Sequence, residues 1–218
     1  MITPTAEPPT TGRHALEGLR RAIAAGELRP GERIRQEEVA AALGVSVAPV
    51  REALATLEQE GQVTYLPRRG YFVAELGLAE LEEIYELRRL LEERAARRAL
   101  PGIDDDRLAA IERAARECGI AARAGDVAAE LAANRRFHFG ILESPDQPQT
   151  QRLIRLLWDS TEAYRAMYYN SPAARQSSLD AHDRILEAVR SRDADRLVAE
   201  LDAHRRHALE ALASVLAP

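Results

Sequence analysis

Hydrophobic residues recur every three or four positions along most of the chain, which is the spacing of an amphipathic helix. The pattern predicts helices at 14–25, followed by Gly26 as a C-terminal cap, and at 36–43, ended by Gly44. A third helix begins at Ser46, which can serve as its N-cap, and ends at Gly61. The stretch 28–34 is predicted as a turn, and the segments 63–65 and 71–73 as two strands around the turn 66–70. This order is that of a winged helix-turn-helix.

From Leu78 onward the helical spacing continues, interrupted only by turn signals such as Pro101-Gly102 and Ser171-Pro172. It predicts six helices, at 78–99, 104–123, 126–143, 148–169, 173–190 and 194–215. The fold class is therefore mainly α, with an N-terminal winged helix-turn-helix at 13–76 and an antiparallel all-α six-helix bundle at 77–218. Residues 1–12, rich in Pro and Thr, are expected to be a disordered tail.

Charge limits the kind of DNA binding that can be considered. The chain of 218 residues has a net charge of -5, which argues against a protein that coats nucleic acid nonspecifically, so any DNA contact must be local. Its single cysteine, Cys118, fits a reducing compartment. We recognise neither a signal peptide nor an apolar run of membrane-spanning length, and expect a cytoplasmic protein.

The helix that begins at Ser46 is the predicted DNA reader. Its core-facing residues are Val50, Leu54 and Leu57. The helical period then turns Ala48 and Arg51 outward, and the Arg51 guanidinium can donate to a guanine edge or a phosphate. The alternative for Arg51 is a surface ion pair with Glu52 or Glu58. At the tip of the hairpin, Arg68 and Arg69 can reach a phosphate or the minor groove, or they are simply solvated turn residues.

The run Leu43-Gly-Val-Ser-Val-Ala-Pro-Val-Arg-Glu-Ala-Leu54, with Pro67-Arg-Arg-Gly70 after it, closely resembles the GntR family of bacterial regulators. The resemblance implies a DNA-binding transcriptional regulator in which the first turns of this helix and the wing tip contact operator DNA. The implied DNA-binding residues are Ser46, Val47, Ala48, Pro49, Arg51, Arg68, Arg69 and Gly70. The family usually has Arg and Thr where this chain has Val47 and Ala48, so its usual operator consensus does not transfer directly.

Polar residues interrupt the apolar stripes of three bundle helices. Asn134 and His138 are i and i+4 neighbours on one stripe, and His182 and His204 lie on two others. Imidazoles on facing helices can hold a transition metal, with the Asn134 oxygen completing the set and positions left for water or an anionic effector. The alternative is that each histidine is a hydrogen-bonded core residue.

The segment Asn134-Arg-Arg-Phe-His138, with His182 and His204 after it, resembles the FCD effector domain of the FadR subfamily. The resemblance implies a divalent metal, whether zinc, nickel or manganese, held by Asn134, His138, His182 and His204 and completed by a carboxylate effector. Many members have Asp at the position of Asn134, and a neutral amide is a weaker ligand. The predicted count of six helices is similar to the VanR-type group.

Arg88 matches a recurrent arginine of these bundles and is a candidate partner for the effector carboxylate, with Asn134 beside it. Its alternative is a solvent-facing ion pair with Glu92. The aromatic residues Trp158, Tyr164, Tyr168 and Tyr169 are expected on one long helix, as core, interface or pocket residues.

The preferred interpretation is a homodimer that binds pseudo-palindromic operator DNA and responds to a small organic acid, with repression relieved by the ligand as the commoner arrangement in the family. Two alternatives stay open. The bundle is only a dimerisation scaffold, or the chain is a metal-dependent enzyme. No His-Glu-x-x-His motif or comparable general base accompanies the histidines, which disfavours the enzyme.

Overall fold

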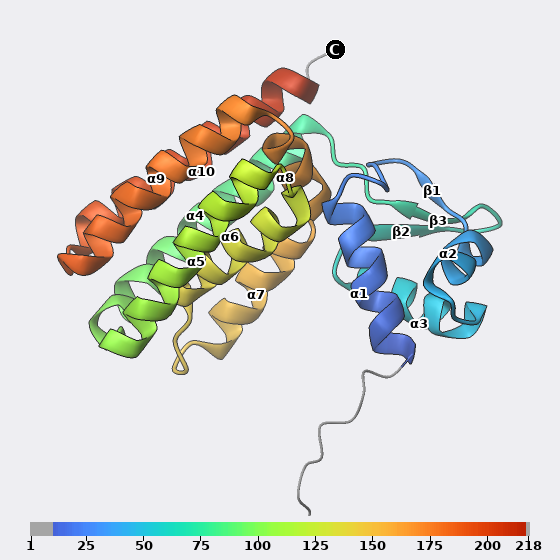
Figure 1. Ribbon diagram of the computed structural model, residues 1–218, viewed down its shortest axis with the longest axis horizontal. Helices are drawn as coiled ribbons and strands as arrows, with labels where there is room; N and C mark the ends of the chain where they lie inside the picture. Colours follow the sequence, from blue (N-terminus) through green and yellow to red (C-terminus); the bar gives the residue numbers. More distant parts are fainter. Residues whose placement is uncertain (1–10, 217–218) are drawn as a thin grey trace, which may run out of the picture. The chain divides into compact units, whose positions relative to one another are not determined.

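The computed structural model describes residues 11–216, which form two compact units, 11–75 and 76–216 (Figure 1). The boundary lies one residue before the one that the sequence predicts. The predicted tail falls mostly on residues 1–10, which lie outside the described residues. Its last two residues, Thr11 and Gly12, instead begin helix α1, Thr11–Ala24.

The N-terminal unit has the predicted order of elements with one addition. Helix α1 is followed by strand β1 (Arg33–Ile34), helices α2 (Gln36–Leu43) and α3 (Val47–Gln59), and the hairpin β2 (Val63–Leu66) and β3 (Gly70–Val73). Strand β1 lies in the segment predicted as a turn. It pairs with β3 opposite Tyr71 and Phe72 and completes an antiparallel sheet of order β1-β3-β2. Two residues are too few to show the alternation that identifies a strand.

Helix α3 is placed by its apolar face and by the turn before it. Gly44 has a φ of 66°, a left-handed conformation that suits glycine, and its N–H returns to the carbonyls of α2. Ser46 occupies the N-cap position, although its hydroxyl makes no capping hydrogen bond. The buried residues of α3 are Val50, Ala53, Leu54 and Leu57. They pack in a core with Leu19 and Ile23 of α1, so the opposite face of α3 is left for solvent.

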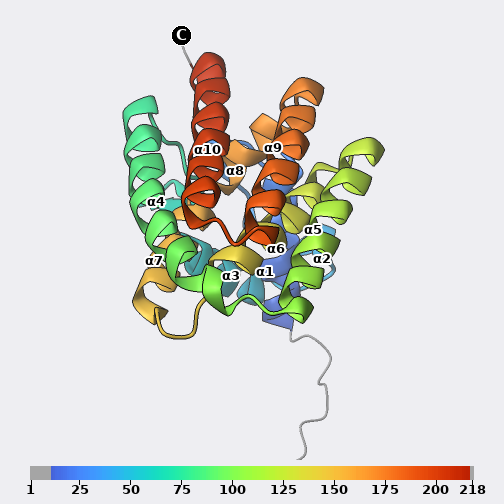
Figure 2. The ribbon, with the colours of Figure 1, turned by 90° about the vertical axis from the view of Figure 1, so that its left-hand side faces the viewer.

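The C-terminal unit is all helical (Figure 2). Its elements are α4 (Leu78–Ala99), a short 3-10 helix (Leu100–Gly102), α5 (Asp105–Ala124), α6 (Val127–Leu142), α7 (Pro148–Asp159), α8 (Glu162–Tyr169), α9 (Pro172–Arg190) and α10 (Ala194–Leu216). Side chains from α4, α5, α6, α7, α9 and α10 share one hydrophobic core.

The helix predicted at 148–169 is two helices, so the described part of this unit has seven α-helices and not six. The break falls at Ser160 and Thr161. The Ser160 hydroxyl donates to the Leu157 carbonyl, and the Thr161 hydroxyl lies within bonding distance of the Leu157 and Trp158 carbonyls. Such local bonds compete with the helical ladder and accompany the interruption of the helix at this point.

Within residues 11–216, no single helix is long and apolar enough to cross a membrane. Helices α2 and α3 reach that length and hydropathy only when taken together, and they are bent by 113° relative to each other.

Candidate functional sites

The outer face of α3 presents the residues predicted to read DNA. Ser46, Ala48 and Arg51 are exposed, while Val47 and Pro49 are half-buried.

The Arg51 side chain makes a long hydrogen bond, 3.4 Å, from Nε to the Gln36 side-chain oxygen of α2. Within the described segment, no ion pair joins Arg51 to Glu52 or Glu58, which were the expected alternative partners. The guanidinium therefore keeps most of its donors for another partner.

The wing tip holds two further cations in a defined turn. Arg68 has a φ of 65° and Gly70 a φ of 94°, so the turn uses the left-handed region at both positions. A non-glycine residue in that region costs about 1–2 kcal/mol. Arg68 and Arg69 are exposed, and the Arg69 guanidinium lies 5.3 Å from the Phe72 ring centroid. The elements predicted to contact DNA thus carry three exposed arginines, one on α3 and two on the wing.

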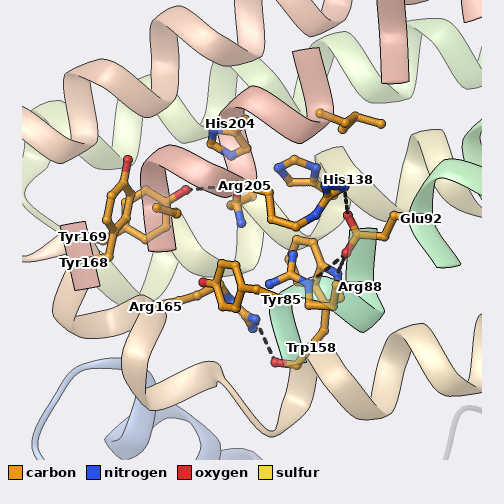
Figure 3. A pocket seen from close by; sticks show the side chains of 13 residues that line it. Tyr85, Arg88, Glu92, His138, Trp158, Arg165, Tyr168, Tyr169, His204 and Arg205 are labelled. Carbon is orange, nitrogen blue, oxygen red and sulfur yellow. Dashed lines mark hydrogen bonds and ion pairs between the residues drawn. The ribbon is translucent and has the colours of Figure 1, made fainter. Parts of the chain in front are cut away.

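Three histidines from three helices meet inside the C-terminal unit. His138 of α6, His182 of α9 and His204 of α10 each offer a ring nitrogen, and these three nitrogens lie within 4.8 Å of one another. The three ring centroids are 5.1–5.3 Å apart, and the His138 and His204 rings are nearly parallel. Figure 3 shows His138 and His204. The structure therefore brings together all three histidines that the sequence singled out.

Two of the three histidines have ring nitrogens without the hydrogen bonds that a purely structural core role requires. Nδ1 of His138 and both ring nitrogens of His182 are buried without a partner among the described residues. Burial is the main reason that the pKa of His138 and His182 lies well below the usual value and that of His204 falls to about 4. Mutual repulsion among the histidines adds to this effect, as does repulsion from Arg88 and Arg205 on His138 and His204. The rings are therefore neutral at pH 7, as metal ligation requires. Unpartnered neutral imidazole nitrogens in this arrangement fit a divalent transition metal.

Asn134 lies one turn before His138 on α6 and lines the same cavity. Its side-chain oxygen accepts a hydrogen bond from the Tyr169 hydroxyl at 3.1 Å, and that hydroxyl is also 2.9 Å from the Ser178 hydroxyl. An amide oxygen has two lone pairs, so one remains for a further partner. Tyr169 thus holds the amide in a fixed orientation.

A buried ion network adjoins the histidines (Figure 3). One Glu92 oxygen accepts from Arg88 Nε at 2.8 Å and from the Trp158 indole at 2.7 Å, and the other accepts from Arg205 at 3.1 Å. Arg88 does pair with Glu92, but the expectation that such a pair would face solvent is wrong. Both side chains are buried, and the Arg88 guanidinium packs over the Trp158 ring, 4.4 Å from its centroid.

The cavity between the network and the histidines is small, about 30 Å³, with room for about two water molecules. Sequence reasoning did not place three charged residues in this cavity: Arg165 and Arg205, which it did not single out, and Glu92, which it considered only as a solvent-facing partner of Arg88. Trp158, Tyr168 and Tyr169 also line it, whereas the Tyr164 hydroxyl bonds the backbone of Leu76. The only sequence signals for the missed residues were the i,i+4 spacing of Glu92 from Arg88 and the position of Arg205 beside His204.

Two families match the two units. Residues 11–73 match the bacterial regulatory proteins of the gntR family, and residues 83–207 match the FCD domain. The HTH-type transcriptional regulator YdhC of Bacillus subtilis is 28% identical over 199 residues, which cover 91% of this chain and 89% of that protein. The Nta operon transcriptional regulator of Aminobacter aminovorans is 32% identical over 178 residues, 81% of this chain and 82% of the relative.

The solved structure of Escherichia coli McbR/YncC has the same fold, with a TM-score of 0.82 at 24% identity over 99% of both chains. The matched proteins are regulators of transcription and not enzymes. The enzyme alternative is therefore excluded. The chain belongs to the GntR family of bacterial transcriptional regulators, with a DNA-binding helix-turn-helix unit followed by an FCD domain.

Proposed function

We propose that this regulator binds operator DNA as a homodimer and that a small anionic effector in the FCD unit releases it, which relieves repression. The observation that carries the effector part is the cluster of three unprotonated imidazoles beside a cationic cavity. Its place of action is the cytoplasm, because bacterial operator DNA lies there.

On the DNA side, Arg51 is the proposed base or phosphate contact, and Arg68 and Arg69 contact the backbone or minor groove. The remaining proposed contacts lie beside them, namely Ser46, Val47, Ala48, Pro49 and Gly70. The small Val47 and Ala48 leave the start of the helix without a second cation. Sequence discrimination therefore falls on fewer side chains than the family pattern supplies.

An Arg51→Ala variant tests the DNA contact. A duplex selected from a randomised pool with the wild-type protein serves as the probe in gel-shift titrations at physiological salt. Loss of a bidentate contact costs about 1–3 kcal/mol, a five- to more than hundredfold weaker affinity. Arg21→Ala, an exposed residue of α1, removes the same charge from the same unit and is the control. Equal affinity of the Arg51 variant and the control would reject the role of Arg51.

In the FCD unit, His138, His182 and His204 would hold zinc, nickel or manganese, and Asn134 would offer an oxygen. The bound ion would supply an electrophilic point to which a carboxylate can bind. Arg88, Arg165 and Arg205 contribute cations to the cavity, and among residues 11–216 nothing pairs with the buried Nε of Arg165 or of Arg205. Unpartnered guanidinium donors beside the histidines favour an anion as the effector. Arg88 and Asn134 are its proposed contacts.

Metal content is measured on the full chain after exposure to each candidate ion and extensive dialysis. The wild type is expected to retain about one ion per chain. The double variant His182→Ala with His204→Ala is expected to retain none. His207→Ala, an exposed histidine one turn further along α10, is expected to behave as the wild type. A wild type that retains none of the three metals would end the metal proposal. If no small organic acid shifts its melting temperature either, the FCD unit is only a scaffold.

A further inference from the structure

Helix α4 has two faces of different character. Its inner face lines the cavity through Tyr85, Arg88 and Glu92. Its outer face carries a stripe of exposed residues spaced alternately three and four apart, the a/d spacing of a coiled-coil seam. The stripe consists of Glu80, Glu83, Leu87, Leu90, Arg94 and Arg97. Leu87 and Leu90 are 41% and 50% exposed, so two large apolar side chains lie at its centre in open solvent.

The stripe is self-complementary when α4 is turned end over end. A twofold axis between residues 88 and 89 places Leu87 opposite Leu90 of a second copy. The same axis places Glu83 opposite Arg94. It also places Glu80 opposite Arg97, but Glu80 already accepts from the Gly77 N–H, and Arg97 already pairs with Glu93 and Asp195, so the charge matching rests on Glu83 and Arg94. An isologous interface requires this reciprocal matching, in which each contact occurs twice. A parallel arrangement would instead put Glu83 against Glu83 and Arg94 against Arg94, which is unfavourable.

We infer that α4 is the dimer interface of the FCD unit, paired antiparallel with α4 of a second copy of this chain. The inference rests on the proposed homodimer and specifies its surface. A stable interface buries about 800 Å² per partner, more than one helical stripe provides. A neighbouring helix must therefore contribute to it. Helix α7 packs beside α4 and exposes two leucines, Leu153 and Leu156.

This placement joins the interface to the cavity through one helix. Leu87 of the stripe is adjacent in sequence to Arg88, which pairs with Glu92 inside the unit. A shift of α4 that follows a change at Arg88 therefore moves Leu87 and Leu90 against the second copy, because a helix moves as a rigid element. The effector site and the spacing of the two reading helices would be linked by this route.

Charge exchange tests the pairing, with dimer dissociation measured by sedimentation equilibrium of the full chain. The wild type is expected to have twice the 24.1 kDa chain mass. Glu83→Arg and Arg94→Glu are each expected to raise the dissociation constant at least tenfold, because each creates two like-charge contacts. The double variant is expected to return to within about threefold of the wild type. Glu82→Arg makes the same charge change at an exposed position of α4 outside the stripe and should have no effect.

Leu87→Asp provides a second test that does not depend on charge pairing and is also expected to weaken the dimer at least tenfold. Fluorescence of Trp158 confirms that each variant is folded. A wild type that stays monomeric at every concentration would overturn both this interface and the homodimer. A dimer that none of these variants weakens, or one weakened by both single changes without recovery in the double variant, would overturn the interface alone.

Discussion

Replacing Glu92 by Gln tests how much the buried network stabilises the FCD unit. The substitution keeps the shape of the side chain but removes its charge and turns one acceptor oxygen into a donor. That donor must face either Arg205, or Arg88 and the Trp158 indole, since these three groups share the two Glu92 oxygens. Two buried guanidinium groups would then lack their common carboxylate. Breaking a buried ion pair on one side costs about 3–5 kcal/mol.

Trp158 is the only tryptophan of the chain, so its fluorescence follows unfolding of the FCD unit alone. With a urea slope of about 2 kcal/mol per molar, the Glu92→Gln midpoint should fall by about 1.5–2.5 M. Circular dichroism gives a second midpoint, because Glu92 touches the indole and changes its emission directly. The control is Glu86→Gln, whose exposed pair with Arg89 is worth less than about 1 kcal/mol. Equal midpoints for the two variants would refute the reasoning.

Three further predictions concern buried positions of the same unit. Burial raises the pKa of Glu130 to about 7 from 4.5, so its contribution to stability is present below pH 4.5 and is lost as the pH rises through 7. Between pH 5 and 8 this group should therefore lower the free energy of unfolding by about 1–2 kcal/mol, and Glu130→Gln should remove that decrease. The free energies come from urea titrations at each pH, and the same pH dependence in the wild type and the variant would contradict the prediction. Burial also raises the pKa of Cys118 to about 12, so its alkylation at pH 8 should proceed only as the unit unfolds, and immediate stoichiometric labelling would be the opposite result. In Gly140→Ala the added carbon would lie 2.8 Å from Ile111 Cγ1, so the melting temperature should drop by an amount equivalent to about 1–3 kcal/mol, and an unchanged temperature would show that Ile111 moves aside freely.

The fold was predictable where a residue that ends a helix, such as glycine, marks the boundary in the sequence. Helix α2 has the predicted bounds because Gly44 ends it in a left-handed turn. The long helix predicted after residue 148 was wrong because no glycine or proline marks its break. The break instead coincides with hydroxyl bonds of Ser160 and Thr161 to backbone carbonyls, which a pattern of apolar residues does not reveal. Strand β1 exists only through its partner, since its two residues pair with β3 and carry no pattern of their own.

The residues of the candidate site also fall into two groups, those that the sequence pattern singled out and those that it did not. Asn134 and His138 stood out because they interrupt an apolar stripe, and the structure buries both. Glu92 and Arg205 did not stand out, because charged residues at these positions also fit a solvated face. Their burial depends on a contact between α4 and α10, residues far apart in the chain. A pattern along one helix reports which way a side chain faces, but not which charge from another helix will meet it there.

The network also limits how an anionic effector can act. Glu92 already holds Arg88 and Arg205, so a carboxylate that took Arg88 away would leave Glu92 facing only Arg205 and the Trp158 indole. Binding by exchange therefore gains little, because one buried anion replaces another. The bond to Glu92 uses only Nε of Arg88, so a carboxylate can approach the other nitrogens of Arg88 without breaking the network. It can add contacts to Nε of Arg165 and of Arg205, which have no partner among the described residues. A ligand shifts an equilibrium only by its difference in affinity between two states. On the proposed mechanism, the released state is therefore the one in which the cavity, now too small for an organic acid, has opened toward Arg165 and Arg205.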